Sequence, residues 1–430
     1  MITAAAFSGK SFAVLGLARS GLATVEALLA SGASVMAWDS KEEARETLRA
    51  SHPSLRIADP SVTSLHGYSG IAVSPGVPLN RHPIAASAQA AKVPVIGDVE
   101  LFALARAELP PHKVVGITGT NGKSTVTTLI HHILQAAGIP TLMGGNIGVP
   151  ILSQDPLPEG GVYVLELSSY QIDLTQSLDC DVAVLLNVTP DHLDRYDSFA
   201  AYAASKARLF QMQRGGVAVL DIATGANFRP LNGGGHGGVV FTDAIPLQEF
   251  GVQETWPALQ GPHNAANAAA AIAVAFQLDI QDQVIAEALR TYPGLPHRME
   301  RVAERNGVLF VNDSKATNPA STAPALAAYP AVRWILGGLP KGDDLSPCEP
   351  HLGHVRGAYT IGEAGPMFAR LLRPKVPVTE CGELGAAVTA AANDAQAGEV
   401  VLLSPACASF DQFKDYEARG AAFRAAVEAL

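Results

Sequence analysis

Cysteine is scarce in this chain: its 430 residues contain four. Cys180, Cys348, Cys381 and Cys407 lie far apart, and no two of them form a C-x-x-C pair. This spacing disfavours a disulfide framework and a cysteine-ligated zinc site, and it fits a reducing compartment. We therefore expect a cytoplasmic protein without zinc.

A membrane span and a basic surface are also missing. The sequence has no run of about 18 uncharged apolar residues, so we expect no membrane insertion. Lys10 and Arg19 interrupt the apolar N-terminus, which argues against a secretory signal. The net charge of −10 disfavours a general nucleic-acid surface. A phosphate site in such a chain must be built locally, from backbone groups.

What the chain does have is length and apolar content. At about 150 residues per domain, 430 residues predict three domains, and 48% hydrophobic residues predict sizeable buried cores. Short β-branched runs alternate with helical patterns, which is typical of α/β layers with mostly parallel sheets. The proline-containing segments Glu108–His112 and Tyr292–Pro296 divide the chain into predicted domains 1–109, 110–294 and 295–430.

Short apolar runs predict strands in each domain. In the first domain they are Phe12–Leu17, Ser34–Asp39, Ile71–Ser74 and Val93–Ile96. In the second they are Val114–Ile117, Val162–Leu167, Asp181–Asn187 and Val217–Leu220. In the third they are Val308–Asn312, Arg333–Leu336, Ala358–Ile361 and Val400–Leu403. The alanine-rich Ala265–Phe276 predicts a buried helix, and the glycine-rich Asn232–Gly238 predicts a surface loop.

The most informative stretch is Val114–Thr125, in which an apolar run leads into a glycine-containing turn and then Lys-Ser-Thr. Glycines let backbone N–H groups close on phosphate oxygens, and the N-terminus of the following helix favours negative charge. Lys123 can reach the outer phosphates, and the Ser124 hydroxyl can bind Mg²⁺. Ile117 stands where the strict P-loop pattern has glycine, and a strand–helix turn with a surface lysine is the alternative. The order of the parts favours a nucleotide site.

A second glycine-containing turn, Gly16–Gly21, follows the first predicted strand and resembles a dinucleotide fingerprint. The middle glycine is replaced by Ala18, which weakens the case for a close pyrophosphate. Asp39 ends the next strand, where an acid that binds ribose would lie. NAD, another nucleotide and plain strand–helix packing all stay open, and we favour another nucleotide. Ser74–Val77 follows a third strand and either lines the same crevice or is a plain turn.

Acidic residues follow two strands of the second domain. Glu166 ends one strand beside the phosphate turn, where it can bind Mg²⁺; the alternative is a carboxylate that faces solvent. Asp191, His192 and Asp194 follow the next strand and are a dense set of metal ligands or proton carriers. The acids can instead cap the next helix. Lys206 lies in a helical stretch, and its pattern alone predicts a solvated lysine.

Polar motifs also mark the third domain and its approach. Asn264 and Asn267 lie three apart on one helix face, where their amides can meet a purine edge or cap the helix. Three loops that follow predicted strands are rich in polar residues and glycine: Asn312–Pro319, Gly337–Gly342 and Ser404–Phe413. Three such loops at one sheet edge favour a binding site over plain turns.

Taken together, these motifs resemble the Mur ligase family over essentially the whole chain. The shared motifs are Gly119–Thr125, His263–Asn267 and Pro296–Arg298. Asp313–Asn318 and Ser404–Phe413 are similar to the D-glutamate-adding branch, and the Asp-Asn-Pro-Arg motif of the diaminopimelate- or lysine-adding branch is missing. The resemblance implies an N-terminal Rossmann-like domain that binds UDP, a central P-loop-type ATPase domain and a C-terminal Rossmann-like domain.

The implied activity is ATP-dependent amide-bond formation. The substrates would be UDP-N-acetylmuramoyl-L-alanine and D-glutamate, joined through an acyl phosphate intermediate during synthesis of the peptidoglycan precursor. ATP and two Mg²⁺ ions are the implied cofactors, and we expect a monomer. Another amino-acid ligase of this family or of the folylpolyglutamate type is the nearest alternative. A nucleotide-driven switch and a dinucleotide oxidoreductase are the others.

The resemblance also implies roles for single residues. The implied ATP contacts are Gly119, Thr120, Asn121, Gly122, Lys123, Ser124, Thr125, Asn264, Asn267, Arg298 and Asp313. Those of the UDP-substrate are Arg19, Ser20, Asp39, Ser40, Ser74, Gly76 and Asn146. Those of D-glutamate are Lys315, Thr317, Lys341, Ser409 and Phe410. The implied catalytic residues are Lys123, His192 and Lys206, and the implied metal ligands are Ser124, Glu166, His192 and a carbamylated Lys206.

Two positions depart from the family pattern. Lys41 stands where some members have an arginine near the uracil pocket, so a bidentate contact is not expected there. Leu339-Pro340 replaces a more polar pair and makes the backbone before Lys341 stiffer.

Overall fold

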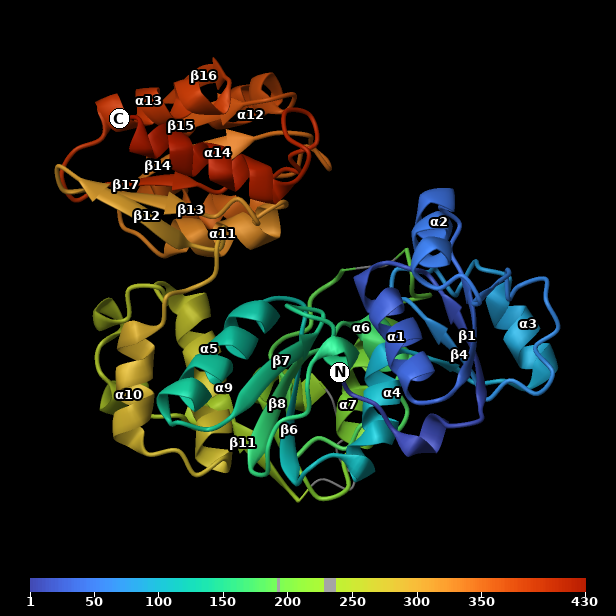
Figure 1. Cartoon of the computed structure of the whole chain (residues 1–430). Helices are drawn as coiled ribbons and strands as arrows, with labels where there is room; N and C mark the ends of the chain where they lie inside the picture. The colour runs from blue at the N-terminus through green and yellow to red at the C-terminus, as the bar shows by residue number, and fades with distance from the viewer. Residues whose placement is uncertain (192–193, 228–236) are drawn as a thin grey trace. The chain divides into compact units, whose positions relative to one another are not determined.

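The computed structural model of the chain describes residues 1–191, 194–227 and 237–430. It contains three separate β-sheets, coloured from blue through green to red in Figure 1. Helices alternate with strands that are mostly parallel, so the predicted α/β class is confirmed. Contacts divide the chain into a first unit, residues 1–246 with 269–285, and a second unit, residues 247–268 with 286–430. The boundaries of the three predicted domains stay a prediction.

The first sheet lies in the first unit and is fully parallel. Its strands are β1 (Ser11–Leu15), β2 (Ser34–Trp38), β3 (Arg56–Ile57), β4 (Gly70–Val73) and β5 (Val95–Ile96). Its helices are α1 (Arg19–Ala30), α2 (Glu42–Ser51), α3 (Ile84–Ala91) and α4 (Asp98–Ala105). The strand order β3-β2-β1-β4-β5 places β1 between β2 and β4, so the loops after these strands share one edge.

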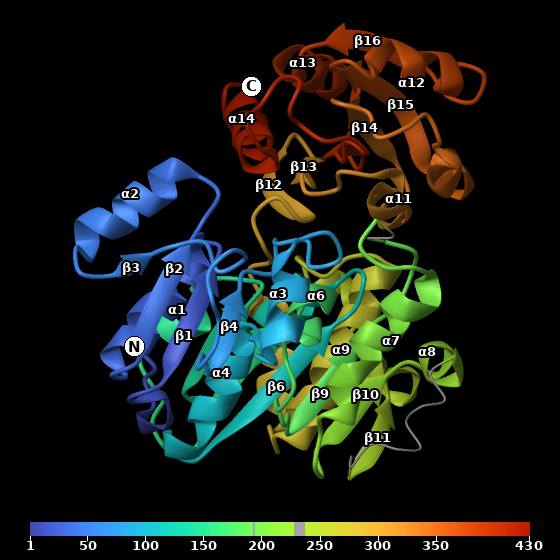
Figure 2. The ribbon, with the colours of Figure 1, turned by 90° about the vertical axis from the view of Figure 1, so that its right-hand side faces the viewer.

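The central sheet belongs to the first unit as well and is also parallel. Its strands are β6 (His112–Thr118), β7 (Thr141–Gly145), β8 (Gly161–Glu166), β9 (Val182–Leu185), β10 (Val217–Leu220) and β11 (Gly238–Phe241). Its helices are α5 (Lys123–Ala136), α6 (Ser169–Asp173), α7 (Phe199–Gln211) and α8 (Ile222–Asn227). The order is β11-β10-β9-β6-β8-β7, and Figure 2 shows β6, β9, β10 and β11 in sequence across the sheet. The helices α9 (Pro262–Gln277) and α10 (Asp282–Thr291) have residues in both units.

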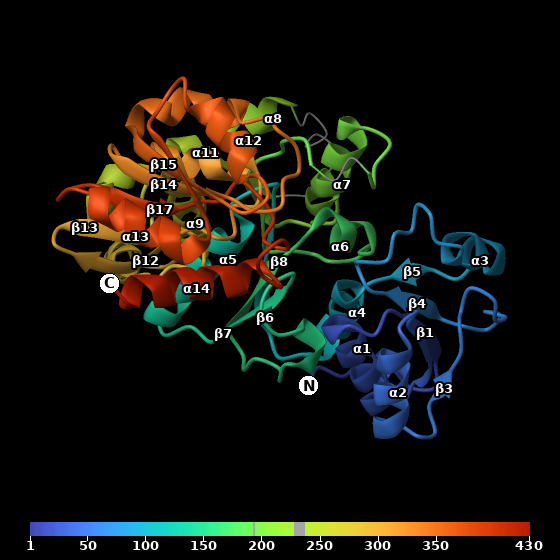
Figure 3. The same ribbon diagram turned by 90° about the horizontal axis from the view of Figure 1, so that it is seen from above.

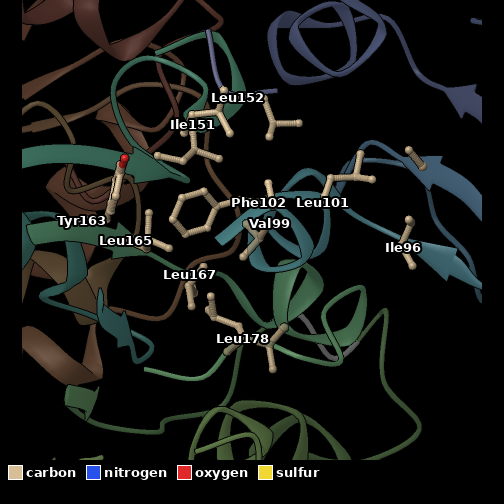
Figure 4. Packing of buried hydrophobic residues seen from close by; sticks show 14 of the residues in the cluster. Ile96, Val99, Leu101, Phe102, Ile151, Leu152, Tyr163, Leu165, Leu167 and Leu178 are labelled. Carbon is tan, nitrogen blue, oxygen red and sulfur yellow. The ribbon is translucent and has the colours of Figure 1, made fainter. Parts of the chain in front are cut away.

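One hydrophobic cluster joins the first and central sheets. Figure 4 shows Phe102 of α4 among side chains of the central sheet, and its ring centroid lies 5.0 Å from that of Tyr163 on β8. The Glu100 carboxylate of α4 accepts hydrogen bonds from the backbone N–H groups of Gln176 at 2.7 Å and Ser177 at 2.9 Å. Apolar packing and a satisfied buried carboxylate therefore hold α4 to the central sheet.

The third sheet lies in the second unit. Its strands are β12 (Glu300–Arg305), β13 (Val308–Asn312), β14 (Val332–Gly337), β15 (Val355–Ile361), β16 (Val378–Gly382) and β17 (Val400–Leu403). Its helices are α11 (Pro319–Ala327), α12 (Gly365–Leu372), α13 (Leu384–Asp394) and α14 (Tyr416–Glu428). The order is β12-β13-β17-β14-β15-β16, in which only β12 is antiparallel. Figure 3 shows α13 and α14 side by side, and both pack into one core with β13 and β17.

All the strands predicted from apolar runs are present, with shifts of a few residues at their ends. His112, assigned to a linker, is instead the first residue of β6. The predicted buried helix is present as α9, and Asn232–His236 of the predicted glycine-rich loop lie outside the described residues. In the part of the chain that the structure describes, no helix is long and apolar enough to cross a membrane.

Candidate functional site

The predicted phosphate turn has the strand–turn–helix geometry that its sequence indicates. β6 ends at Thr118, four residues form the turn, and α5 begins at Lys123. Gly119 has φ +152° and Gly122 has φ +86°, a backbone conformation that favours glycine. The turn therefore presents its backbone at the N-terminus of α5, where negative charge is favoured.

Asn187, which follows β9, holds this turn in place. Its Oδ1 accepts from the Asn121 N–H at 2.9 Å, and its Nδ2 donates to the Asn121 carbonyl at 3.0 Å. The Asn187 carbonyl accepts from the Thr120 N–H at 2.9 Å. Asn187 was expected only as the end of a strand, and its support of the turn could not be read from the sequence. The one signal in the sequence was the presence of an asparagine, Asn187, at the end of a predicted strand.

Two lysines meet at the turn. Lys123 Nζ and Lys206 Nζ each donate to the Gly119 carbonyl at 2.9 Å, and Lys123 Nζ also donates to the Thr120 carbonyl at 2.9 Å. Lys206 lies on α7 and is 2% exposed, so the solvated lysine expected from the pattern alone is wrong. Burial, and secondly the charge of Lys123, lowers the pKa of the Lys206 amine to about 7.

Glu166 ends β8 beside β6 and is 2% exposed, so the alternative of a carboxylate that faces solvent is wrong. Its Oε1 accepts from Asn146 Nδ2 at 2.8 Å. Its Oε2 is buried and has no hydrogen-bond partner among the residues that the structure describes. A buried carboxylate oxygen left in this state fits a site for a cation, since an uncompensated charge is costly.

The acidic segment after β9 is only partly described. His192, the predicted metal ligand and catalytic residue, lies outside the described residues. The acids do not cap the next helix: α7 is capped by the Ser198 side chain, which accepts from the Ala201 N–H at 3.1 Å. Within the described ranges, no group of three or more His, Cys, Asp or Glu side chains is placed to hold a metal.

The glycine-containing turn after β1 lies at the sheet edge where the loops after β2 and β4 begin. Asp39 Oδ2 accepts from the Leu17 N–H at 2.7 Å, and Ser74 Oγ donates to the Gly16 carbonyl at 3.0 Å. A Cβ on Gly21 would lie 1.9 Å from the Gly16 carbonyl oxygen, so the close approach of α1 requires glycine there. Of the other predicted UDP contacts at this edge, Arg19 and Ser20 begin α1, and Ser40 and Gly76 lie in the loops after β2 and β4.

Arg195 connects the loops of the two sheets within the first unit. Its Nη2 donates to the Val77 carbonyl at 2.9 Å, and its guanidinium lies 4.3 Å from the centroid of the Tyr170 ring. The loop after β4 is therefore held close to the segment that follows β9. The first unit contains both the predicted UDP-substrate contacts and the predicted phosphate contacts of Gly119–Thr125.

The remaining predicted residues lie in the second unit. Asn267 Nδ2 donates to Asn264 Oδ1 at 3.0 Å, and Asn264 Nδ2 donates to the Gln260 carbonyl at 3.1 Å, so the two amides share one face of α9 as predicted. Burial raises the pKa of the Asp313 carboxyl to about 7, and Asp313 Oδ2 accepts from Ser404 Oγ at 2.8 Å.

The three polar loops of the second unit follow β13, β14 and β17, which are neighbours in the sheet order β13-β17-β14. They carry the predicted D-glutamate contacts Lys315, Thr317, Lys341, Ser409 and Phe410. Ser409 is buried, whereas the Phe410 side chain is 68% exposed. Lys315 Nζ lies 4.0 Å from the centroid of the Tyr416 ring, a residue that the sequence did not single out. Arg298 precedes β12, close enough for its charge to act on Asp313.

Comparison with known proteins decides the family. Three family models match in series: Mur ligase MurD-like, N-terminal domain, over residues 10–97; Mur ligase middle domain, over 117–229; and Mur ligase, glutamate ligase domain, over 297–407. The UDP-N-acetylmuramoylalanine--D-glutamate ligase of Novosphingobium aromaticivorans is 62% identical, over 100% of this chain and 97% of the relative.

The chain belongs to the Mur ligase family.

Other members agree with this assignment. The protein of the same name in Sphingopyxis alaskensis is 59% identical, over all of both chains. The solved structure of the MurF ligase of Thermotoga maritima in complex with ADP has a TM-score of 0.62 at 16% identity, over 98% of this chain and 96% of that one. At 16% identity, the structural similarity to the MurF ligase shows only that the two chains share a fold.

Proposed function

We propose that this Mur ligase uses ATP to join D-glutamate to the L-alanine carboxylate of UDP-N-acetylmuramoyl-L-alanine, in the synthesis of the peptidoglycan precursor. The phosphate turn, whose Gly119 carbonyl accepts from both Lys123 and Lys206, supports a reaction driven by ATP. The observation that carries the choice of substrates is 62% identity over the whole chain to a relative of that name. We further propose that the enzyme acts as a cytoplasmic monomer on these small substrates and on no nucleic acid.

A free carboxylate is a poor acyl donor, because its charge repels a nucleophile and oxide is a poor leaving group. In the first step, an oxygen of the alanine carboxylate attacks the γ-phosphorus of ATP, so that an acyl phosphate forms and ADP leaves. Phosphoryl transfer of this kind depends on alignment and on charge neutralisation. Lys123 and the backbone N–H groups at the start of α5 perform these tasks. The N–H groups of Thr120 and Asn121 donate to Asn187 instead and hold the turn in place.

In the second step, the amine of D-glutamate attacks the activated carbonyl. A C–N bond forms, phosphate leaves with the electrons of the C–O bond, and the nitrogen loses a proton. We assign the amino acid to Lys315, Thr317, Lys341, Ser409 and Phe410, and adenine to Asn264 and Asn267 with Arg298 and Asp313 on the nucleotide. We assign the UDP-sugar to the loops after β1, β2 and β4 and to Asn146, which already bonds to Glu166.

We assign Mg²⁺ to Ser124, Glu166 and His192, in two sites of which the second includes a carbamylated Lys206. The cations would supply charge neutralisation for the phosphate oxygens. The unpartnered Oε2 of Glu166 supports this assignment. Carbamylation requires a neutral amine. With a pKa of about 7, the Lys206 side chain is neutral in a substantial fraction of the protein at neutral pH. The product is an anionic oxygen ligand in place of a cation.

The deciding experiment is incubation of the purified protein with ATP, Mg²⁺ and UDP-N-acetylmuramoyl-L-alanine across a panel of amino acids. We expect phosphate release and a new amide product, seen by mass spectrometry, with D-glutamate and not with L-glutamate, lysine or diaminopimelate. Product with another amino acid would assign the chain to a sister ligase. ATP hydrolysis with no amide product from any amino acid would contradict a ligase and favour a nucleotide-driven switch.

A further inference from the structure

Helix α14 buries an arginine where its pattern calls for an apolar residue. Arg419, Phe423 and Val427 are four residues apart and share one helix face. Phe423 and Val427 are fully buried in the core beside β13 and β17, and Arg419 is 1% exposed. Arginine is almost never buried to this extent without a partner. No carboxylate among the described residues forms an ion pair with it.

The partners of Arg419 are backbone carbonyls and one hydroxyl. Its Nε donates to Ser314 Oγ at 3.0 Å, and its Nη2 donates to the carbonyls of Ser314 at 2.9 Å and Cys407 at 3.0 Å. Its Nη1 donates to the carbonyls of Ala408 at 3.1 Å and Gly337 at 3.5 Å. A guanidinium has five N–H donors in a planar fork, so every donor is used.

These acceptors belong to three different loops. Ser314 follows β13, Gly337 ends β14, and Cys407 and Ala408 follow β17. These are the loops that carry the residues assigned above to D-glutamate. Bonds between the loops complete the arrangement, since the N–H of Leu339 donates to the Ala408 carbonyl at 2.9 Å and that of Ala406 to the Ala316 carbonyl at 3.0 Å.

Ser314 carries the connection one step further. It is fully buried, its Oγ accepts from Arg419, and the same Oγ donates to the Tyr416 carbonyl at 2.9 Å. Tyr416 is the first residue of α14, and its ring lies under Lys315 Nζ. The arginine, the start of α14 and Lys315 are therefore connected through direct contacts.

Burial lowers the pKa of the Arg419 guanidinium to about 10, so it stays charged at neutral pH. A buried cation is stabilised only while its hydrogen bonds are made. An apolar side chain of similar length would remove the guanidinium as a donor to these buried carbonyls. The Ala408 carbonyl would keep its bond from the Leu339 N–H, and each group left unpaired is costly. The loops would then relax away from one another.

We infer that Arg419 is a positioning residue for the amino-acid substrate: it fixes the three loops relative to one another and does not itself touch the substrate. The inference rests on the proposed function, because D-glutamate is the ligand assigned to these loops. A purely structural arginine would instead stabilise the unit with no particular effect on one substrate. The two roles differ in which kinetic constant changes.

The test compares Arg419→Met and Arg419→Lys with Phe423→Leu, a matched change on the same buried face that leaves the loop bonds intact. KM is measured for each substrate, and hydroxylamine traps the acyl phosphate, a readout of the first step that needs no D-glutamate. For Arg419→Met we expect the KM of D-glutamate to rise about 50-fold, as buried acceptors lose a charged donor. Trapping and the KM values of ATP and the UDP-substrate should change less than about 2-fold.

Arg419→Lys keeps the charge but not the fork, so its KM for D-glutamate should lie between those of wild type and Arg419→Met. Phe423→Leu should lower Tm and leave this KM within about 2-fold of wild type. An unchanged D-glutamate KM in Arg419→Met, or an equal rise in Phe423→Leu at equal loss of Tm, would overturn the inference. If Arg419→Met does not fold, Arg419→Lys and Ser314→Ala decide by the same KM comparison. Failure of wild type to yield any trapped hydroxamate would instead overturn the proposed function.

Discussion

Lys123 and Lys206 donate to the same carbonyl oxygen, that of Gly119, each at 2.9 Å. One carbonyl has two lone pairs and can accept both. Two ammonium groups this close repel each other, and the repulsion adds to burial in lowering the pKa of Lys206. Two lysines therefore contact the phosphate turn: Lys123, which is proposed to bind phosphate, and Lys206, whose lowered pKa favours the neutral amine.

Replacing Lys123 with alanine should abolish ATP-dependent ligation. In the proposed mechanism Lys123 neutralises charge on the transferred phosphoryl group, so its loss should lower kcat/KM by at least about 100-fold. Lys113→Ala is the matched control, because Lys113 is exposed at the opposite end of the same strand, β6. Coupled detection of ADP measures both. Near-normal turnover in Lys123→Ala would contradict the proposal that this turn binds ATP.

Lys206→Ala should be inactive and should regain part of its activity when acetate or another short carboxylate is added. The added anion can stand where the carbamate would place its oxygens. Rescue is measured as turnover against carboxylate concentration, with Lys123→Ala as the variant that should show none. A folded Lys206→Ala protein that no carboxylate rescues would count against carbamylation.

Asn187→Ala should weaken nucleotide binding, because it removes both side-chain bonds that hold Asn121. Two lost hydrogen bonds predict a rise of about 10-fold in the KM of ATP. Asn187→Asp retains an acceptor for the Asn121 N–H and should have a smaller effect. The KM of D-glutamate in the same variants is the internal control. Equal changes in both KM values would mean general damage instead of a local role.

Asp98, at the start of α4, should make stability fall as pH rises. Burial raises the pKa of its carboxyl to about 6, above the usual 3.8. Between these values the unfolded state has lost the proton while the folded state keeps it, so the contribution is complete below about pH 4 and is lost as pH rises toward 6. Asp98→Asn lacks this titration. Urea unfolding of both proteins gives the free energy of unfolding at each pH. Between pH 5 and pH 7.5 this free energy should fall by about 1 kcal/mol more in wild type than in Asp98→Asn. Parallel pH profiles would contradict the prediction.

The sequence predicted the inner strands of each sheet and missed most of those at the edges. The strands that no apolar run indicated are β3, β7, β11, β12 and β16, and each lies at the end of its sheet. An inner parallel strand is covered on both faces and needs a continuous apolar run. An edge strand can carry several charged residues, as Glu300–Arg305 does, so its composition gives little signal.

The site divides in a similar way. The phosphate turn and the polar loops could be predicted because each is a contiguous motif. Lys206 bonds to a residue 87 positions away and Asn187 to one 66 positions away. Arg419 bonds to Ser314, 105 positions away, as well as to the nearer Cys407 and Ala408. Only the packing of elements brings such pairs together, so no local pattern could reveal them.

The packing of Phe102 against Tyr163 makes the first sheet inseparable from its neighbour. A fragment that ends at residue 109 would expose to water the apolar side chains of α4 that now pack against the central sheet. We expect such a fragment to aggregate. Heating the intact protein should melt residues 1–109 and the central sheet in a single calorimetric transition. The loops proposed to bind the UDP-sugar therefore depend on the central sheet, and exchanging them between ligases would require exchanging the side chains that pack around Phe102 and Tyr163 as well.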